Sequence, residues 1–158
     1  MIKMKNLLII LLLIFYTSSG SLYSQNKTIQ GRVIDNHDLD PMAYVAIIIN
    51  DTVQIGRTDL NGFFQIEISD LVKKILFRSV GMEPATIELA DTCNEVEVVM
   101  ILSSTYDFKT LKKVDKLRKK KFKKLPALHK EAFAKGIFKT DKACYTQEFI
   151  PSYTKKRK

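Results

Sequence analysis

The sequence has no tryptophan, only two cysteines and only two histidines among its 158 residues. A zinc peptidase site needs three protein ligands, commonly including two or more histidines, so this chain has little material for one. The six glycines are dispersed, and no glycine-rich phosphate loop follows a predicted strand. No serine lies in a nucleophile-elbow pattern. The sequence therefore predicts no catalytic site, no metal and no cofactor.

Long hydrophobic runs are also scarce, and the longest one is N-terminal. Lys3 and Lys5 precede nine uninterrupted apolar residues at 7–15, which a small and polar stretch follows. This order is typical of a signal peptide, and nine residues are about half of the roughly 20 that a membrane-spanning helix needs. We expect residues 1–24 to be cleaved near Ser24, giving an exported, soluble protein of the periplasm or cell envelope. The alternative is a buried N-terminal helix.

Negative charge is scarce in the C-terminal third. Residues 26–102 carry 6 basic and 12 acidic side chains, whereas residues 103–158 carry 18 and 5. The net charge of +9 therefore comes from the C-terminal segment, and the segment before it is acidic. This division predicts two parts after the signal peptide, a domain at 26–102 and a basic tail at 103–158.

Alternating hydrophobicity is the main pattern of residues 28–102. Phe64, Ile66 and Ile68 alternate with polar residues, and similar short runs lie around 74–78, 86–89 and 95–98. Residues 43–49 are apolar on both faces, as in a central strand. Turn residues separate the runs. We predict a mainly β fold, an immunoglobulin-like sandwich of about seven strands.

Two of the turns carry glycine. Asp59, Asn61 and Gly62 form a hairpin pattern, and Gly81 opens another turn. The first turn resembles part of a calcium loop, but Arg57 and Ile68 occupy the positions that need carboxylates. The sequence therefore assigns these residues a structural role.

The chain resembles a known family at these positions. The matching residues are Gly31, Val33, Asp35, Pro41, Ala43, Val45, Ile47, Gly56, Thr58, Asp59, Asn61, Gly62, Phe64, Leu76, Ser79, Val80 and Gly81. They are similar to the carboxypeptidase regulatory-like domains, which have a transthyretin-like β-sandwich and are abundant in exported proteins of Bacteroidota. One departure is Met82, where the family usually has an aromatic residue. The resemblance implies a non-catalytic accessory module, and we expect it to stand alone because neither a peptidase domain nor a barrel accompanies it.

The basic tail has helical periodicity. Apolar residues recur from Phe108 to Leu125 with lysines between them, which predicts an amphipathic helix that ends or kinks at Pro126. A second helix is expected at 127–135, with Gly136 as its cap. Residues 137–158 show no clear pattern, and we expect the last few to be disordered.

The tail concentrates positive charge in one short run. This run contains Arg118, Lys119, Lys120, Lys121, Lys123 and Lys124. Such a cluster favours an anionic partner, either an acidic envelope protein or an anionic membrane surface. Nucleic acid is not expected, because the protein is predicted to be exported. The alternative is a structural module whose tail packs on its own acidic sandwich.

The remaining candidate residues are the cysteines and histidines. Cys93 and Cys144 can pair in an oxidising compartment, although the sequence is equally compatible with no bridge. His129 and His37 would carry the chemistry of an enzyme alternative. We expect His129 to lie on the surface and to have no catalytic role.

Overall fold

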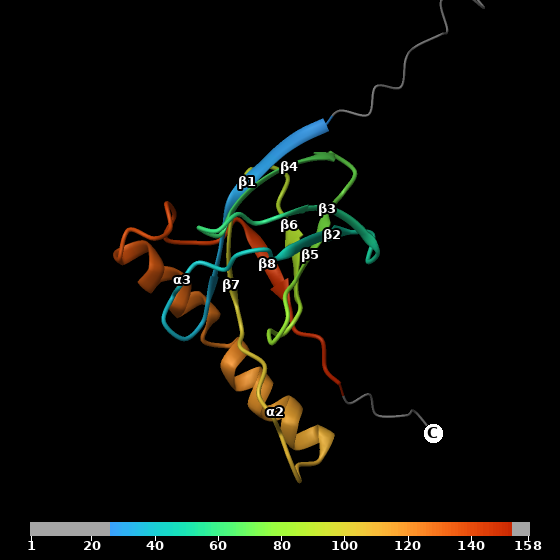
Figure 1. Cartoon of the computed structure of the whole chain (residues 1–158), viewed down its shortest axis with the longest axis vertical. Helices are drawn as coiled ribbons and strands as arrows, with labels where there is room; N and C mark the ends of the chain where they lie inside the picture. The colour runs from blue at the N-terminus through green and yellow to red at the C-terminus, as the bar shows by residue number, and fades with distance from the viewer. Residues whose placement is uncertain (1–25, 153–158) are drawn as a thin grey trace, which may run out of the picture.

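The computed structural model describes residues 26–152. The predicted signal peptide at 1–24 and the residues 155–158, which were predicted to be disordered, lie outside these residues. Eight strands form two sheets (Figure 1). The strands are β1 (Asn26–Asp35), β2 (Ala46–Ile49), β3 (Val53–Arg57), β4 (Phe63–Ser69), β5 (Lys74–Arg78), β6 (Ala85–Leu89), β7 (Glu95–Met100) and β8 (Tyr145–Glu148).

The three-stranded sheet has the order β4-β1-β7, and the five-stranded sheet has the order β3-β2-β5-β6-β8. β1 pairs antiparallel with β4 and parallel with β7. The prediction of a mainly β sandwich is confirmed. The count of seven strands was one short, because β8 comes from the C-terminal segment whose sequence showed no clear pattern. Its alternation is too brief to be seen in four residues.

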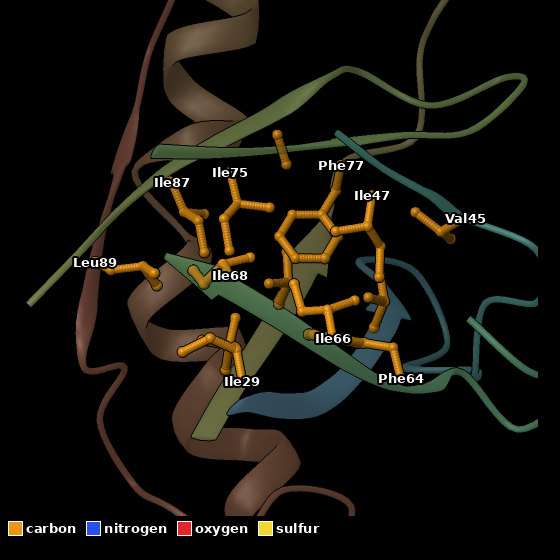
Figure 2. Close-up of a cluster of buried hydrophobic side chains, with 14 of the residues drawn as sticks. Ile29, Val45, Ile47, Phe64, Ile66, Ile68, Ile75, Phe77, Ile87 and Leu89 are labelled. Atoms are coloured by element: carbon orange, nitrogen blue, oxygen red, sulfur yellow. The ribbon is translucent and has the colours of Figure 1, made fainter. Parts of the chain in front are cut away.

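The inner core fills the space between the sheets (Figure 2). Phe64, Ile66 and Ile68 of β4 point into it, while Gln65 and Glu67 are exposed. β2 lies between β3 and β5 and is therefore a central strand, as predicted. It begins at Ala46 rather than residue 43, because Tyr44 has a left-handed φ of 58° and interrupts the extended backbone.

A second set of buried residues lies on the other face of the three-stranded sheet. This outer core consists of Ile34, Leu39, Val99, Ile101, Leu125, Ala132 and Phe138. The first four belong to the sandwich domain and the last three to the C-terminal segment. The C-terminal segment is therefore part of the folded protein, because it covers apolar residues that β1 and β7 place on their outer face.

Within residues 26–152, two helices precede β8. They are α2 (Leu111–Phe122) and α3 (Leu125–Ala134), and α3 packs against β7 (Figure 1). α2 begins later than predicted, since Phe108 has a left-handed φ of 58°. The predicted break at Pro126 was also misplaced. Pro126 lies in the first turn of α3, where a missing N–H costs nothing. Gly136 follows α3 with a φ of 71°, as expected of a C-terminal cap.

The predicted apolar stripe of the first helix is only partly used. Leu125 is buried, but Phe108 and Leu111 are exposed, and no residue of α2 is fully buried. The stripe therefore packs on the sandwich only in part. The first turn of α2 extends past the end of the sheet, so its apolar side chains have no surface to cover.

The glycine turns have the geometry their sequences require. Asp59 accepts backbone hydrogen bonds from Asn61 and Phe63 at 2.9 and 2.8 Å. Gly62 has a φ of 76°, and a Cβ there would lie 2.4 Å from the carbonyl oxygen of Val33. Gly81 has a φ of 77°. Residues 26–152 contain no helix with the length and hydrophobicity of a membrane span.

Candidate functional site

The basic run predicted to bind a partner lies on α2 and just after it. Arg118 does not share the exposure of its neighbours, because its side chain is only 16% exposed. Its guanidinium donates to Glu83 at 2.6 Å and to Asp115 at 3.0 Å. The hydrogen bond to Glu83 raises the pKa of Arg118 above its ordinary value. Arg118 therefore attaches α2 to the loop between β5 and β6, and its role in partner binding stays a prediction.

The same face of α2 makes a second contact with the domain. Lys121 donates from Nζ to the hydroxyl of Ser104 at 2.5 Å and to the carbonyl oxygen of Leu102 at 3.2 Å. Val114, Leu117 and Phe122 on this face are half-buried. These side chains fix the orientation of the helix about its own axis.

The opposite face of α2 is made of lysines. We call Lys112, Lys113, Lys116, Lys119, Lys120, Lys123 and Lys124 the lysine face, and all seven are exposed. At 100° per residue the five lysines within α2 cover one continuous arc of the helix, and Lys123 and Lys124 follow directly after it. Within residues 26–152, none of the seven forms an ion pair. The predicted binding residues Lys119, Lys120, Lys123 and Lys124 thus share one surface with three further lysines.

This arrangement creates a positive potential directed away from the domain. The acidic residue of α2, Asp115, lies on the opposite side with Arg118, so the arc contains no negative charge. Like charges at i and i+4 repel and reduce helix stability by a few tenths of a kcal/mol per pair. An anionic partner would relieve this repulsion. Chemically, exposed ammonium groups in this arrangement can pair with carboxylates or phosphates.

The sequence missed a buried carboxylate that holds the C-terminal segment in place. Glu97 was expected on the solvent face of its strand, but it is 2% exposed. It accepts hydrogen bonds from the backbone N–H of Lys139 at 2.5 Å, from the N–H of Thr140 at 3.1 Å and from the hydroxyl of Thr140 at 2.8 Å. Alternation alone could not reveal this burial, because the covering residues lie more than 40 positions away.

A disulfide lies at the same junction. The structure pairs Cys93 with Cys144, with a separation of 51 residues along the chain. The phenol of Tyr145, the next residue, donates to the carbonyl oxygen of Glu97 at 2.6 Å. Burial raises the pKa of Tyr145, which keeps this phenol a donor. The bridge and the buried hydrogen bonds together join β8 to β7.

Comparison with known proteins identifies the sandwich. A family model for the CarboxypepD_reg-like domain matches residues 29–114, which is more than half of the chain. The chain belongs to this family. The matched part of this CarboxypepD_reg-like domain contains β1 to β7 and the beginning of α2. No curated protein matches the sequence.

Family membership indicates a non-catalytic β-sandwich module. Five residues of the lysine face, from Lys116 to Lys124, lie beyond the matched range. Glu97 and Cys93 lie within it, whereas their partners Thr140 and Cys144 lie outside it. The C-terminal segment is thus an addition that the CarboxypepD_reg-like domain integrates through specific contacts.

The two histidines of the domain lie in different environments. His37 is exposed and its Nδ1 lies 2.8 Å from Asp38, a contact that raises its pKa. His129 is 4% exposed and its ring contacts Phe138, so the prediction of a surface position was wrong. Burial lowers the pKa of His129. No cluster of three potential metal ligands occurs in the part of the chain that the structure describes.

Proposed function

We propose that this protein is an exported accessory module of the cell envelope that binds an acidic protein through the lysine face of α2. The observation that carries the proposal is the division of charge on one helix. Arg118 and Lys121 are used by the fold, whereas the seven lysines of the opposite face are exposed and have no counter-charge within residues 26–152. The signal peptide predicted from residues 1–24 supports a location in the envelope.

A protein partner is favoured over a membrane by the position of the apolar side chains. A helix that lies in a membrane interface inserts an apolar face while its lysines reach the headgroups. In α2, Val114, Leu117 and Phe122 are half-buried against the domain. They are therefore not free to insert. Leu111 is the one exposed apolar side chain of α2, which does not make an apolar face.

The alternative of a self-contained structural module applies to another part of the C-terminal segment. Leu125, Ala132 and Phe138 complete the outer core, and Lys139 pairs with Glu95 of the sandwich at 2.9 Å. Residues 125–148 therefore serve the fold. The proposal assigns partner binding to the lysine face only.

The test is capture of envelope proteins by two variants of equal charge. One replaces Lys116, Lys120 and Lys123 with glutamine, which keeps helix propensity. The control replaces Arg57, Arg78 and Lys130, which are also exposed. We expect the wild type and the control to retain a protein with an acidic segment that high salt releases, and the α2 variant to lose it.

Two outcomes would contradict the proposal. Equal retention by both variants would exclude the lysine face. Loss of all protein partners together with flotation on phosphatidylglycerol vesicles would assign the surface to lipid instead.

A further inference from the structure

β8 is an edge strand whose outer side has no partner in the described structure. Its neighbour is β6, and the N–H of Ala90 donates to the carbonyl oxygen of Cys144 at 3.2 Å. Because hydrogen-bonded pairs alternate along an antiparallel ladder, Thr146 and Glu148 face β6. Tyr145 and Gln147 therefore direct their N–H and C=O groups away from it. Within residues 26–152, no other strand is paired with this side of β8.

Two cavities lie beside β8 on the side of the helices. Each has a volume of about 300 Å³, and Gln147 lines both of them. The walls of the first include Val99, Leu125, His129, Ala143 and Tyr145. The walls of the second include Pro84, Ile101, Phe122, Phe149 and Ile150. Both cavities are therefore mainly apolar, and together they follow the strand.

The polar groups of the two cavities indicate the charge of an occupant. In the second cavity, Arg118 is neutralised by Glu83, and Glu148 pairs with Lys74 at 2.6 Å. Asp141 and Lys142, of opposite charge, both line the first cavity. The space beside β8 is thus charge-balanced and suits uncharged side chains. α2 forms part of the second cavity and carries the lysine face on its far side. Acidic residues at the end of a bound segment that lies near α2 would therefore be attracted to the lysine face.

We propose that an extended peptide segment of a partner adds to β8 as a further strand. Its main chain would exchange hydrogen bonds with Tyr145 and Gln147. Side chains two residues apart in a strand lie on the same face and are separated by about 6.7 Å. Two apolar side chains at this spacing would enter the two cavities, while acidic residues follow toward α2. Main-chain pairing with pockets for alternate side chains is a known mode of peptide recognition.

This inference goes beyond the proposed function. The main-chain pairing with β8 does not depend on the lysine face, and only the acidic flank of the occupant rests on it. The probe is a seven-residue peptide of alternating threonine and valine that ends in two glutamates. Titration up to about 1 mM, followed by NMR of the labelled protein, detects binding of a few kcal/mol. We expect shifts in the amides of Tyr145 and Gln147 and in residues of the two cavities.

A matched pair of variants separates edge pairing from other contacts. Gln147→Pro removes an N–H that faces away from β6 and leaves the β6 ladder intact, as proline on an edge strand does. Gln147→Ala keeps the N–H and changes only the side chain. We expect binding at least about tenfold weaker with proline and little changed with alanine. Ala143→Phe, which fills the first cavity, serves as a second blocking variant should the proline variant unfold.

Three results would overturn this inference. They are no shifts at the highest peptide concentration, shifts elsewhere on the surface, and equal binding by folded Gln147→Pro and Gln147→Ala. A concentration-dependent dimer that Gln147→Pro abolishes would also overturn it, because the edge would then pair with a second copy of this chain. Loss of envelope partners in the α2 variant with peptide binding retained would show that the two surfaces are separate.

Discussion

The two faces of the β4-β1-β7 sheet are covered in different ways. The inner core comes mostly from side chains that alternate along six strands, β1, β2 and β4 to β7, with Cys93 beside them. The outer core joins Ile34 and Val99 of the sheet to Leu125 and Phe138 of the C-terminal segment. The outer contact also needs the buried carboxylate of Glu97 and the Cys93–Cys144 bridge.

The two coverings distinguish the basic side chains that the fold uses from those that it leaves exposed to a partner. Near the outer core, Lys139 makes a defined contact with Glu95 of the sandwich. The lysine face lies beyond that core, and its side chains form no ion pair within residues 26–152. A basic side chain in this segment therefore serves the fold where a neighbouring surface covers it. Where no surface covers it, the side chain is available to a partner.

The largest expected effect on the free energy of unfolding comes from truncating one phenylalanine in each core. Phe77 is fully buried between the sheets and Phe138 is 3% exposed in the outer core. We expect Phe77→Ala to cost about 4 kcal/mol of unfolding free energy and Phe138→Ala about 3 kcal/mol. Hydrogen exchange should show loss of protection throughout the sandwich in the first variant and mainly at 125–148 in the second. Equal, global loss in both would show that the cores are one cooperative unit.

The disulfide tests the link between the two regions. Its loop spans 51 residues, so replacing both cysteines with serine should lower the free energy of unfolding by about 4 kcal/mol in the chain-entropy account. Denaturant unfolding of oxidised wild type and the double variant measures this difference. An unchanged midpoint would mean that the hydrogen bonds of Glu97 suffice to hold β8.

Glu97 is expected to have a somewhat smaller effect. Glu97→Ala leaves partly buried donors of Lys139 and Thr140 without an acceptor, which should cost about 3 kcal/mol. Glu97→Gln keeps one acceptor oxygen and should cost about 1 kcal/mol. Glu67→Ala, at an exposed position of β4, is the control and should leave the melting temperature unchanged. Equal melting temperatures for all three variants would contradict a stabilising role of Glu97.

The smallest expected effect is a pH dependence that comes from the outer core. Burial holds the pKa of His129 below its ordinary value, so the unfolded state binds more protons than the folded state as the pH falls below about 6.5. Stability should therefore decrease between about pH 7 and about pH 5. This decrease should be smaller in His129→Phe. His37→Asn is the control, because the pKa of His37 is shifted in the opposite direction.

Much of the sandwich could be predicted because its pattern is local. Alternation along residues 64–68 identified β4, and Asp59 with Gly62 identified the turn before it. The outer core could not be predicted in the same way. The burial of Glu97 and His129 depends on contacts between residues far apart in the sequence, and β8 is too short to show a period. The separation of Arg118 from its lysine neighbours depends on Glu83, whose position only the fold reveals.

The most direct test of the central claim compares binding and stability in the same proteins. Fluorescent poly-glutamate is titrated with three proteins over a range of salt concentrations. They are the wild type, the variant with glutamine at Lys116, Lys120 and Lys123, and the control changed at Arg57, Arg78 and Lys130. The melting temperature of each protein is measured in parallel. The account predicts that the α2 variant alone loses affinity and salt dependence while its melting temperature is unchanged. Equal affinity in both variants, or loss of binding that follows loss of stability, would contradict it.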